Sequence, residues 1–420
     1  MGRIYEDGFL ACSSISRVPL EVWASILRKA TECPDTFTTS YLQGPSLTAS
    51  ERRRYGECMR TKRALSSVCR VWSGLTTPYL YEHVKLLHIR TLYSLLHNLT
   101  NSIGFQHGKM VTHGDYVLRL DVTFCDLNQE TVGSDILSIL QHLFRNLPNL
   151  KVLLLKELRC FYRPLRSMQA TKTRRFFLES VTPKLEVISW IDGASVSAKL
   201  WASFLRSHPR IRALLLPCCE PLAGLSSLRI QLPHLEEVIS CARRDLIFYP
   251  EAFTTGDLPS LKRLIHLLPY NQDYRPTYIG HHPFLLIHGH KLQSVHFWSF
   301  NRVGEFPLSK FLRAVQEACP KVCEIGLTCY WNDIVSFPSL PAVHTLAIRN
   351  LDPQFGKGDC RAMLRSLVEA KVKGLVGLRV VRFVDERNLA HLRKHFHQQL
   401  NSAATALAKL SVFIEGVDLP

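Results

Sequence analysis

Residues 147–155 read Leu-Pro-Asn-Leu-Lys-Val-Leu-Leu-Leu, a proline followed by apolar residues in the pattern L-x-x-L-x-L. Related segments occur eleven times from residue 117 onward, and their ten intervals cover 290 residues, a mean spacing of 29. Because strand side chains alternate between two faces, each segment predicts a strand with one buried face. The segments begin at Val117, Leu150, Leu185, Ile211, Leu235, Leu261, Leu292, Val322, Val343, Leu378 and Leu407.

Proline stands two residues before the start of seven of these segments. Proline cannot continue a helix, and the residue before it favours an extended backbone. It therefore predicts a change from helix to strand at the same place in each unit. These residues are Pro148, Pro183, Pro209, Pro233, Pro259, Pro320 and Pro341.

Apolar residues at helical spacing lie between the predicted strands. A unit of one strand and one helix cannot bury its apolar face alone, whereas stacked units share a core. The pattern predicts an α/β fold in which a curved solenoid carries parallel strands on its concave side. The alternative is an ordinary α/β domain with proline-led strands. The helical stripes are Ile136-Leu140-Leu143-Leu147, Trp201-Phe204-Leu205, Phe311-Leu312-Val315, Met363-Leu364-Leu367-Val368 and Leu389-Leu392-Phe396-Leu400.

Over residues 110–415 these units resemble the leucine-rich-repeat family in its longer, irregular form. One departure is clear. The asparagine or cysteine that the family carries eight residues after each start is present only as Cys125 and Cys219. The resemblance implies a solenoid whose turns on the convex side are closed in varied ways.

The N-terminal region predicts a small helical module. Proline at the first position of a helix sacrifices no hydrogen bond, and in Val18-Pro-Leu-Glu-Val22 it precedes apolar residues on one helical face. Cys33-Pro34 predicts the end of this helix, and the capping pair Thr48 and Glu51 predicts where helix resumes. A further stripe predicts helix from Leu65 to Leu75, with Pro78 ending it.

These segments resemble an F-box. The residues that carry the resemblance are Val18-Pro-Leu-Glu-Val22, Ile26-Leu27, Lys62-Arg63-Ala-Leu65, Val68-Cys-Arg-Val-Trp72 and Pro78-Tyr-Leu-Tyr-Glu82. Val18 replaces the usual leucine, and an insertion at about 35–60 lengthens a connection that is short in a compact F-box. We therefore expect a tail over 1–14, an F-box-like trihelical module over 15–90, and the solenoid over 91–420.

The F-box resemblance implies docking to a Skp-type adaptor and, through it, to a cullin–RING ubiquitin ligase. A trihelical unit this small buries little by itself, so a partner groove would complete its core. The alternative is that the same residues pack against the solenoid. By motif position, the adaptor-binding residues are Pro19, Leu20, Val22, Ile26, Leu27, Val68, Cys69, Val71 and Trp72.

A target protein is expected on the concave side of the solenoid. Strand alternation predicts which side chains point away from the core, and several of them are apolar. A contiguous exposed apolar patch usually marks a partner site. The alternatives are that another segment covers this face, or that the strand phase is shifted by one residue. The expected target-binding residues are Leu154, Leu215, Ile239, Arg263, Ile265, His296 and Trp298.

The candidate motifs for catalysis and cofactor binding do not have the residue spacing that such sites require. The segment Gly104–Met110 has three residues between its glycines instead of four, and methionine where a phosphate loop needs serine or threonine. Cys319, Cys323 and Cys329 do not have the paired spacing of a zinc site, nor do the histidines between 281 and 290. We therefore expect no enzyme activity, no cofactor and no metal.

Composition favours an intracellular, soluble protein. The chain carries 52 Lys and Arg against 35 Asp and Glu, which gives a net charge of +17. Because its basic clusters are short, nucleic-acid binding is the weaker hypothesis. We find no apolar run of membrane length and no secretory signal, so we expect the cytoplasm, the nucleus or both. The preferred function is a substrate-recognition subunit of a Skp–cullin–F-box ligase. The alternative is a stand-alone leucine-rich-repeat scaffold or inhibitor.

Overall fold

The computed structural model is an α/β structure that divides into two compact units, residues 1–187 and 188–420, each described below by itself. The parallel sheet has twelve strands in the described part of the chain, three in the first unit and nine in the second. The structure describes residues 18–32, 49–100, 102–106, 109–123, 134–156, 178–190, 198–215, 230–241, 256–268, 283–299, 308–328, 338–349, 357–384 and 386–417.

The first unit begins with three helices, α1 (Leu20–Thr31), α2 (Ala49–Ser66) and α3 (Arg70–Glu82). Three contacts hold them together. The rings of Trp23 and Trp72 lie 5.5 Å apart, the Cys58 thiol donates to the Thr31 carbonyl at 2.9 Å, and the Tyr79 hydroxyl donates to the Ala24 carbonyl at 3.0 Å. A trihelical arrangement is therefore present, and α2 starts directly after the expected capping residue.

Two details of the helix prediction are wrong. The stripe from Leu65 to Leu75 is not one helix, because α2 ends at Ser66 and the Ser66 and Ser67 hydroxyls bond to the carbonyls of its last turn. Pro78 does not end α3, which continues to Glu82. The next residue, Tyr79, donates from its hydroxyl to the Ala24 carbonyl of α1.

The parallel sheet starts earlier than the sequence predicts. Strand β1 (His83–Leu86) follows α3 without a linker and pairs in parallel with β4 (Arg119–Thr123), which pairs with β5 (Val152–Lys156). The first strand thus lies inside the range expected for the helical module. The intervening elements are α4 (Ile89–Thr100), the antiparallel hairpin of β2 (Ser102–Gln106) and β3 (Lys109–Thr112), the 3-10 helix η4 (His113–Tyr116) and, after β4, α5 (Ser134–Arg145).

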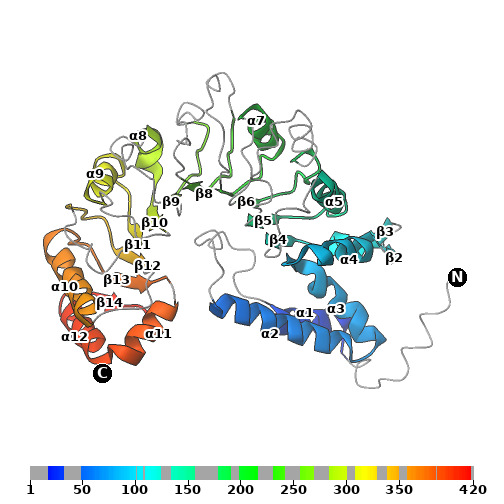
Figure 1. Ribbon diagram of the computed structural model, residues 1–420, viewed down its shortest axis with the longest axis horizontal. Coiled ribbons are helices and arrows are strands. Elements are labelled where there is room, and N and C mark those ends of the chain that lie inside the picture. The colour runs from blue at the N-terminus through cyan, green and yellow to red at the C-terminus, as the bar shows by residue number, and fades with distance from the viewer. Residues whose placement is uncertain are drawn as a thin grey trace. The chain divides into compact units, whose positions relative to one another are not determined.

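The second unit alternates strands with helices, and its strands pair in the order of the chain. In Figure 1 its strands β8 to β12 lie on the inner side of an arc, and α8, α9 and α10 lie on the outer side. This arrangement is consistent with a repeat solenoid. The strands are β6 (Val187–Trp190), β7 (Ala213–Leu215), β8 (Glu237–Cys241), β9 (Arg263–Leu268), β10 (Ser294–Ser299), β11 (Glu324–Thr328), β12 (Thr345–Arg349), β13 (Val380–Phe383) and β14 (Phe413–Ile414).

The helices of this unit confirm most of the predicted stripes. The exception is the last stripe, which was expected as one helix and is broken at Phe396, whose backbone leaves the helical region. The helices are α7 (Ala198–Ser207), α8 (Pro283–His288), α9 (Leu308–Ala318), α10 (Lys357–Lys373), α11 (Glu386–His395) and α12 (His397–Ala408), with the 3-10 turn η8 (Gly289–Lys291) after α8.

Every proline-led segment begins with the same tight turn. The amide of the first apolar residue donates to the carbonyl three residues earlier, at 3.1 to 3.4 Å in all seven, for example from Leu150 to Leu147. Proline therefore occupies the second position of the turn, where its fixed φ is favourable and no amide hydrogen is needed. The last residue of the turn is apolar and buried in all seven, and the first is a buried apolar residue in five, the exceptions being Thr182 and His208.

Ten of the eleven predicted segments contain a strand, and the predicted apolar positions align between neighbouring strands from β7 to β10. The middle apolar position forms one buried column, in which Leu214 aligns with Val238, Val238 with Leu264 and Leu264 with Val295. The eleventh prediction is wrong. Leu407 lies in α12, and the final strand is Phe413–Ile414, in which Ile414 aligns with Val381.

Candidate functional site

Large apolar side chains are exposed on α1 and on the turn between α2 and α3. Val22 is 45% exposed and Ile26 is 47% exposed, and their spacing of one helical turn places them on the same face of α1. Leu20 at the start of the helix is 42% exposed, and Val68 in the turn is 62% exposed. We call these four residues the apolar docking residues. They are four of the nine positions that the F-box resemblance assigned to an adaptor.

The other five assigned positions differ in how deeply they are buried within the helical module. Leu27 is 1% exposed and faces the three-helix core, so it is not available to a partner in this structure. Trp72 is half-buried against Trp23, and Cys69 and Val71 are also half-buried. Pro19 is exposed and starts α1, since its carbonyl accepts from the amides of Val22 and Trp23.

The side chains that were expected to form an exposed apolar patch on the inner face of the repeats are buried. Leu154, Leu215, Ile239 and Ile265 are each at most 1% exposed, as are His296 and Trp298. The expectation that these side chains are exposed is therefore wrong. A phase error is not the reason, because Ile239 aligns with Ile265 and Ile265 with His296 as predicted. Both faces of these strands are enclosed within the chain, as is common for parallel sheets.

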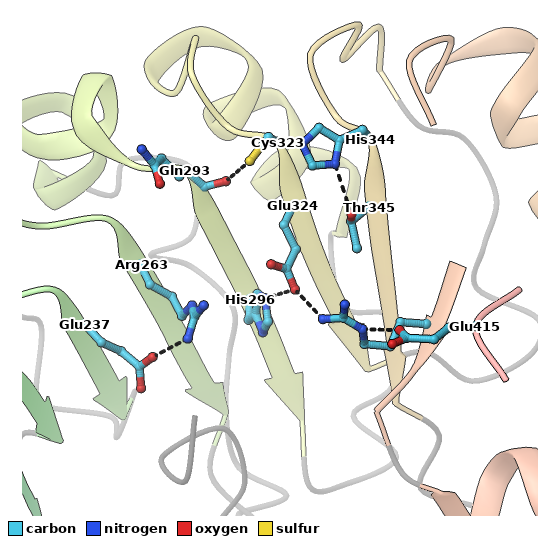
Figure 2. Close-up of polar contacts among 10 residues, drawn as sticks. Glu237, Arg263, Gln293, His296, Cys323, Glu324, His344, Thr345 and Glu415 are labelled. Atoms are coloured by element: carbon cyan, nitrogen blue, oxygen red, sulfur yellow. Dashed lines mark hydrogen bonds and ion pairs between the residues drawn. The ribbon is translucent and has the colours of Figure 1, made fainter. Parts of the chain in front are cut away.

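Charged side chains line the inner face of β8 to β13 as a set of ion pairs (Figure 2). Arg263 donates to Glu237 at 2.8 Å, and the imidazole of His296 lies 3.2 Å from a Glu324 oxygen. Arg382 lies 3.8 Å from Glu324 and also donates to Glu415 at the end of β14. Sequence alternation placed Glu237, Arg263 and His296 on this face but missed Glu324, the partner of His296. The signal was available, because Glu324 occupies the same outward phase on the neighbouring strand.

The protonation of Glu237 should make folding depend on pH. Burial raises its pKa to about 7 from 4.5, against the opposing effect of Arg263. Since the folded state binds this proton more tightly, the stabilisation is full below about pH 4.5 and is lost as pH rises through 7. Between these two pH values, we expect the free energy of unfolding of the wild type to fall by on the order of 1–3 kcal/mol relative to that of Glu237→Gln. Urea unfolding at a series of pH values measures this difference. The control is Glu317→Gln, at an exposed position of α9, whose unfolding free energy should change with pH as that of the wild type does. A Glu237→Gln profile parallel to the wild type would contradict the assignment.

Gly326 is required by its neighbour on the adjacent strand. A Cβ at this position would lie 2.5 Å from Cγ of the His296 ring, which is held by Glu324 and packs edge-on against Trp298 at 5.2 Å. We expect Gly326→Ala to destabilise the fold by about 1–3 kcal/mol, measured by urea unfolding. Gly256→Ala is the matched control, because a Cβ there meets nothing within 4 Å. Equal effects of the two substitutions would refute the packing explanation.

A buried ionic cluster joins the helical module to the first strands. Arg119 donates to both oxygens of Asp121, at 2.8 and 3.0 Å, and His83 lies 3.1 Å from the same carboxylate. Burial lowers the pKa of His83 to about 4, so the imidazole is neutral at pH 7 and donates from Nε2. The Tyr55 ring of α2 packs edge-on against His83 at 4.8 Å, and its hydroxyl donates to the His83 carbonyl at 3.3 Å. Helix α2 is thereby attached to β1.

Histidine, cysteine and acidic side chains are dispersed over the described part of the chain. Within it, no group of three histidine, cysteine or acidic side chains could hold a metal ion. Cys58, Cys69, Cys319 and Cys323 are free thiols, and burial raises the pKa of Cys319 to about 12, which disfavours the thiolate. Cys329 and residues 281–282, considered above as ligands, lie outside the described residues. No helix in the described part of the chain is long and apolar enough to cross a membrane.

No family model matches the chain, and no curated protein matches it.

Proposed function

We propose that this chain is the substrate-recognition subunit of a Skp–cullin–F-box type ubiquitin ligase. In this role α1 and the α2–α3 turn bind the adaptor, and the repeats bind a target protein. The chain itself would carry out no chemistry. Catalysis would gain from proximity, because a bound target is held near the transfer machinery and the encounter becomes effectively intramolecular.

One observation carries this proposal: the exposure of Leu20, Val22, Ile26 and Val68. A folded module gains by covering large apolar side chains, and each Val, Leu or Ile that is fully removed from water contributes about 1.5–3 kcal/mol. These residues are already about half-buried, so a partner would gain part of this amount from each. The exposed positions are those at which the F-box resemblance places adaptor contacts.

The attachment of the module to the sheet supports the same role. Helix α3 continues directly into β1, and Tyr55 and His83 fix α2 to that strand. A docking module that packs onto the strands that follow it, instead of being tethered by a flexible linker, suits a receptor, because flexible linkage dilutes the proximity effect.

Co-expression with a Skp-type adaptor, followed by size-exclusion chromatography, tests the proposal. We expect a one-to-one complex that is lost on combined substitution of Val22 and Ile26 by glutamate. A stand-alone scaffold or inhibitor, which is the competing function, would elute without the adaptor. Pairing the same double variant with target capture separates the two functions, because target binding by the repeats should survive in the variant.

A further inference from the structure

A polar groove lies between two helices on the outer side of the second unit. It has a volume of about 430 Å³ and runs between α10 and α12, which pack against each other. Its floor is apolar, since Leu364 and Ala403 are buried. The hollow exists because α12 presents small residues along this face, including Ser402, Ala403 and Ala406. Larger side chains at these positions would close it.

The rim of this groove carries two arginines, with Glu369 one helical turn beyond the second of them on α10. Arg361 and Arg365 are exposed and one helical turn apart, so both guanidinium groups stand on the same face of α10. In the part of the chain that the structure describes, neither arginine forms an ion pair. Helix α12 has no charged residue other than the titratable His397, and no acidic residue lines the groove. Gln398 and Ser402 add neutral donors opposite the arginines.

We propose that this groove binds a phosphate monoester. Two forked guanidinium groups match the oxygens of a phosphate, which accepts several charge-assisted hydrogen bonds at once. The amide of Gln398 and the hydroxyl of Ser402 supply further donors from the opposite wall. The volume accommodates a phosphorylated side chain together with a few neighbouring atoms, and the apolar floor suits its carbon chain. This site is independent of the adaptor-binding proposal, since it uses no residue of the first unit.

Calorimetric titration of the full chain tests this site with two probes, O-phosphoserine and a capped pentapeptide that contains phosphoserine between glycines. The buffer should hold about 150 mM salt and about pH 7.5, so that general attraction to the basic chain is screened and the phosphate is doubly charged. We expect saturable binding that falls by about tenfold or more in Arg361→Gln/Arg365→Gln. Ala406→Phe, which fills the groove without changing charge, should weaken binding similarly.

The double variant Arg210→Gln/Arg313→Gln is the matched control, because it removes two exposed arginines elsewhere in the same unit. It should bind as the wild type does, and Ile26→Glu should also bind normally. No binding by the wild type, unchanged binding in Arg361→Gln/Arg365→Gln, or an equal loss in the control would each overturn the site. Equal affinity for both probes would identify a free phosphate ester as the ligand source, and tighter binding of the peptide would identify a phosphorylated protein segment.

Discussion

Ile26→Glu is expected to abolish stable binding of a Skp-type adaptor while the protein stays folded. Ile26 is 47% exposed on α1, so a charge there meets water in the free chain. In a complex the same carboxylate would be buried, unpaired, against an apolar groove of the adaptor, which costs binding free energy. The loss of the apolar contact made by Ile26 adds to this cost. We expect an affinity loss of about 100-fold in a titration with purified adaptor. The melting temperature should change by no more than about 2 °C.

Leu87→Glu is the matched control for this substitution. Leu87 is also an exposed aliphatic residue of the first unit, at 49%, but it follows β1 and lies outside the apolar docking residues. Its replacement should leave adaptor affinity within about twofold of the wild type. If both substitutions weaken binding equally, α1 is not the contact surface.

Asp121→Leu should produce the largest loss of stability. Arg119 is fully buried, and the substitution removes the carboxylate that accepts two of its hydrogen bonds. Breaking one side of a buried ion pair costs about 3–5 kcal/mol, because a charge remains in a poorly solvated site. Urea unfolding followed by tryptophan fluorescence measures this loss. The double substitution Arg119→Met/Asp121→Leu should recover most of it, since no buried charge is then left.

An exposed ion pair provides the comparison. Lys151 and Glu186 lie 3.2 Å apart on the same unit, with both side chains substantially exposed. Surface pairs of this kind contribute about 0–1 kcal/mol, so Glu186→Leu should have a small effect. If Asp121→Leu costs no more than Glu186→Leu, the cluster does not hold β1 and β4 together as described.

The repeated strand–helix units could be predicted from sequence because one physical constraint recurs in each of them. A turn with proline in its second position that ends on a buried apolar residue leaves few other residue choices. The pattern therefore located strands such as Val152–Lys156 and their register. Strand His83–Leu86 was missed because it directly follows a helix and has no proline-led turn to mark it.

The interaction surfaces were only partly predictable. Ile26 and Leu27 are adjacent in the motif, yet the first is exposed and the second buried, which depends on how α1 rotates against its neighbours. Alternation correctly predicted that Ile239 and Ile265 point away from the central apolar column. It could not predict that this second face is also enclosed, because alternation specifies which face a side chain is on and carries no information about what covers that face.

Hydrogen–deuterium exchange of the full chain, with and without a purified Skp-type adaptor, tests most directly whether α1 is a docking helix. We predict that the adaptor slows amide exchange in Leu20–Thr31 and around Val68, while strands β8 to β12 exchange as in the free chain. Failure to form a complex, or protection confined to the repeats, would contradict the assignment of this chain as an adaptor-bound receptor.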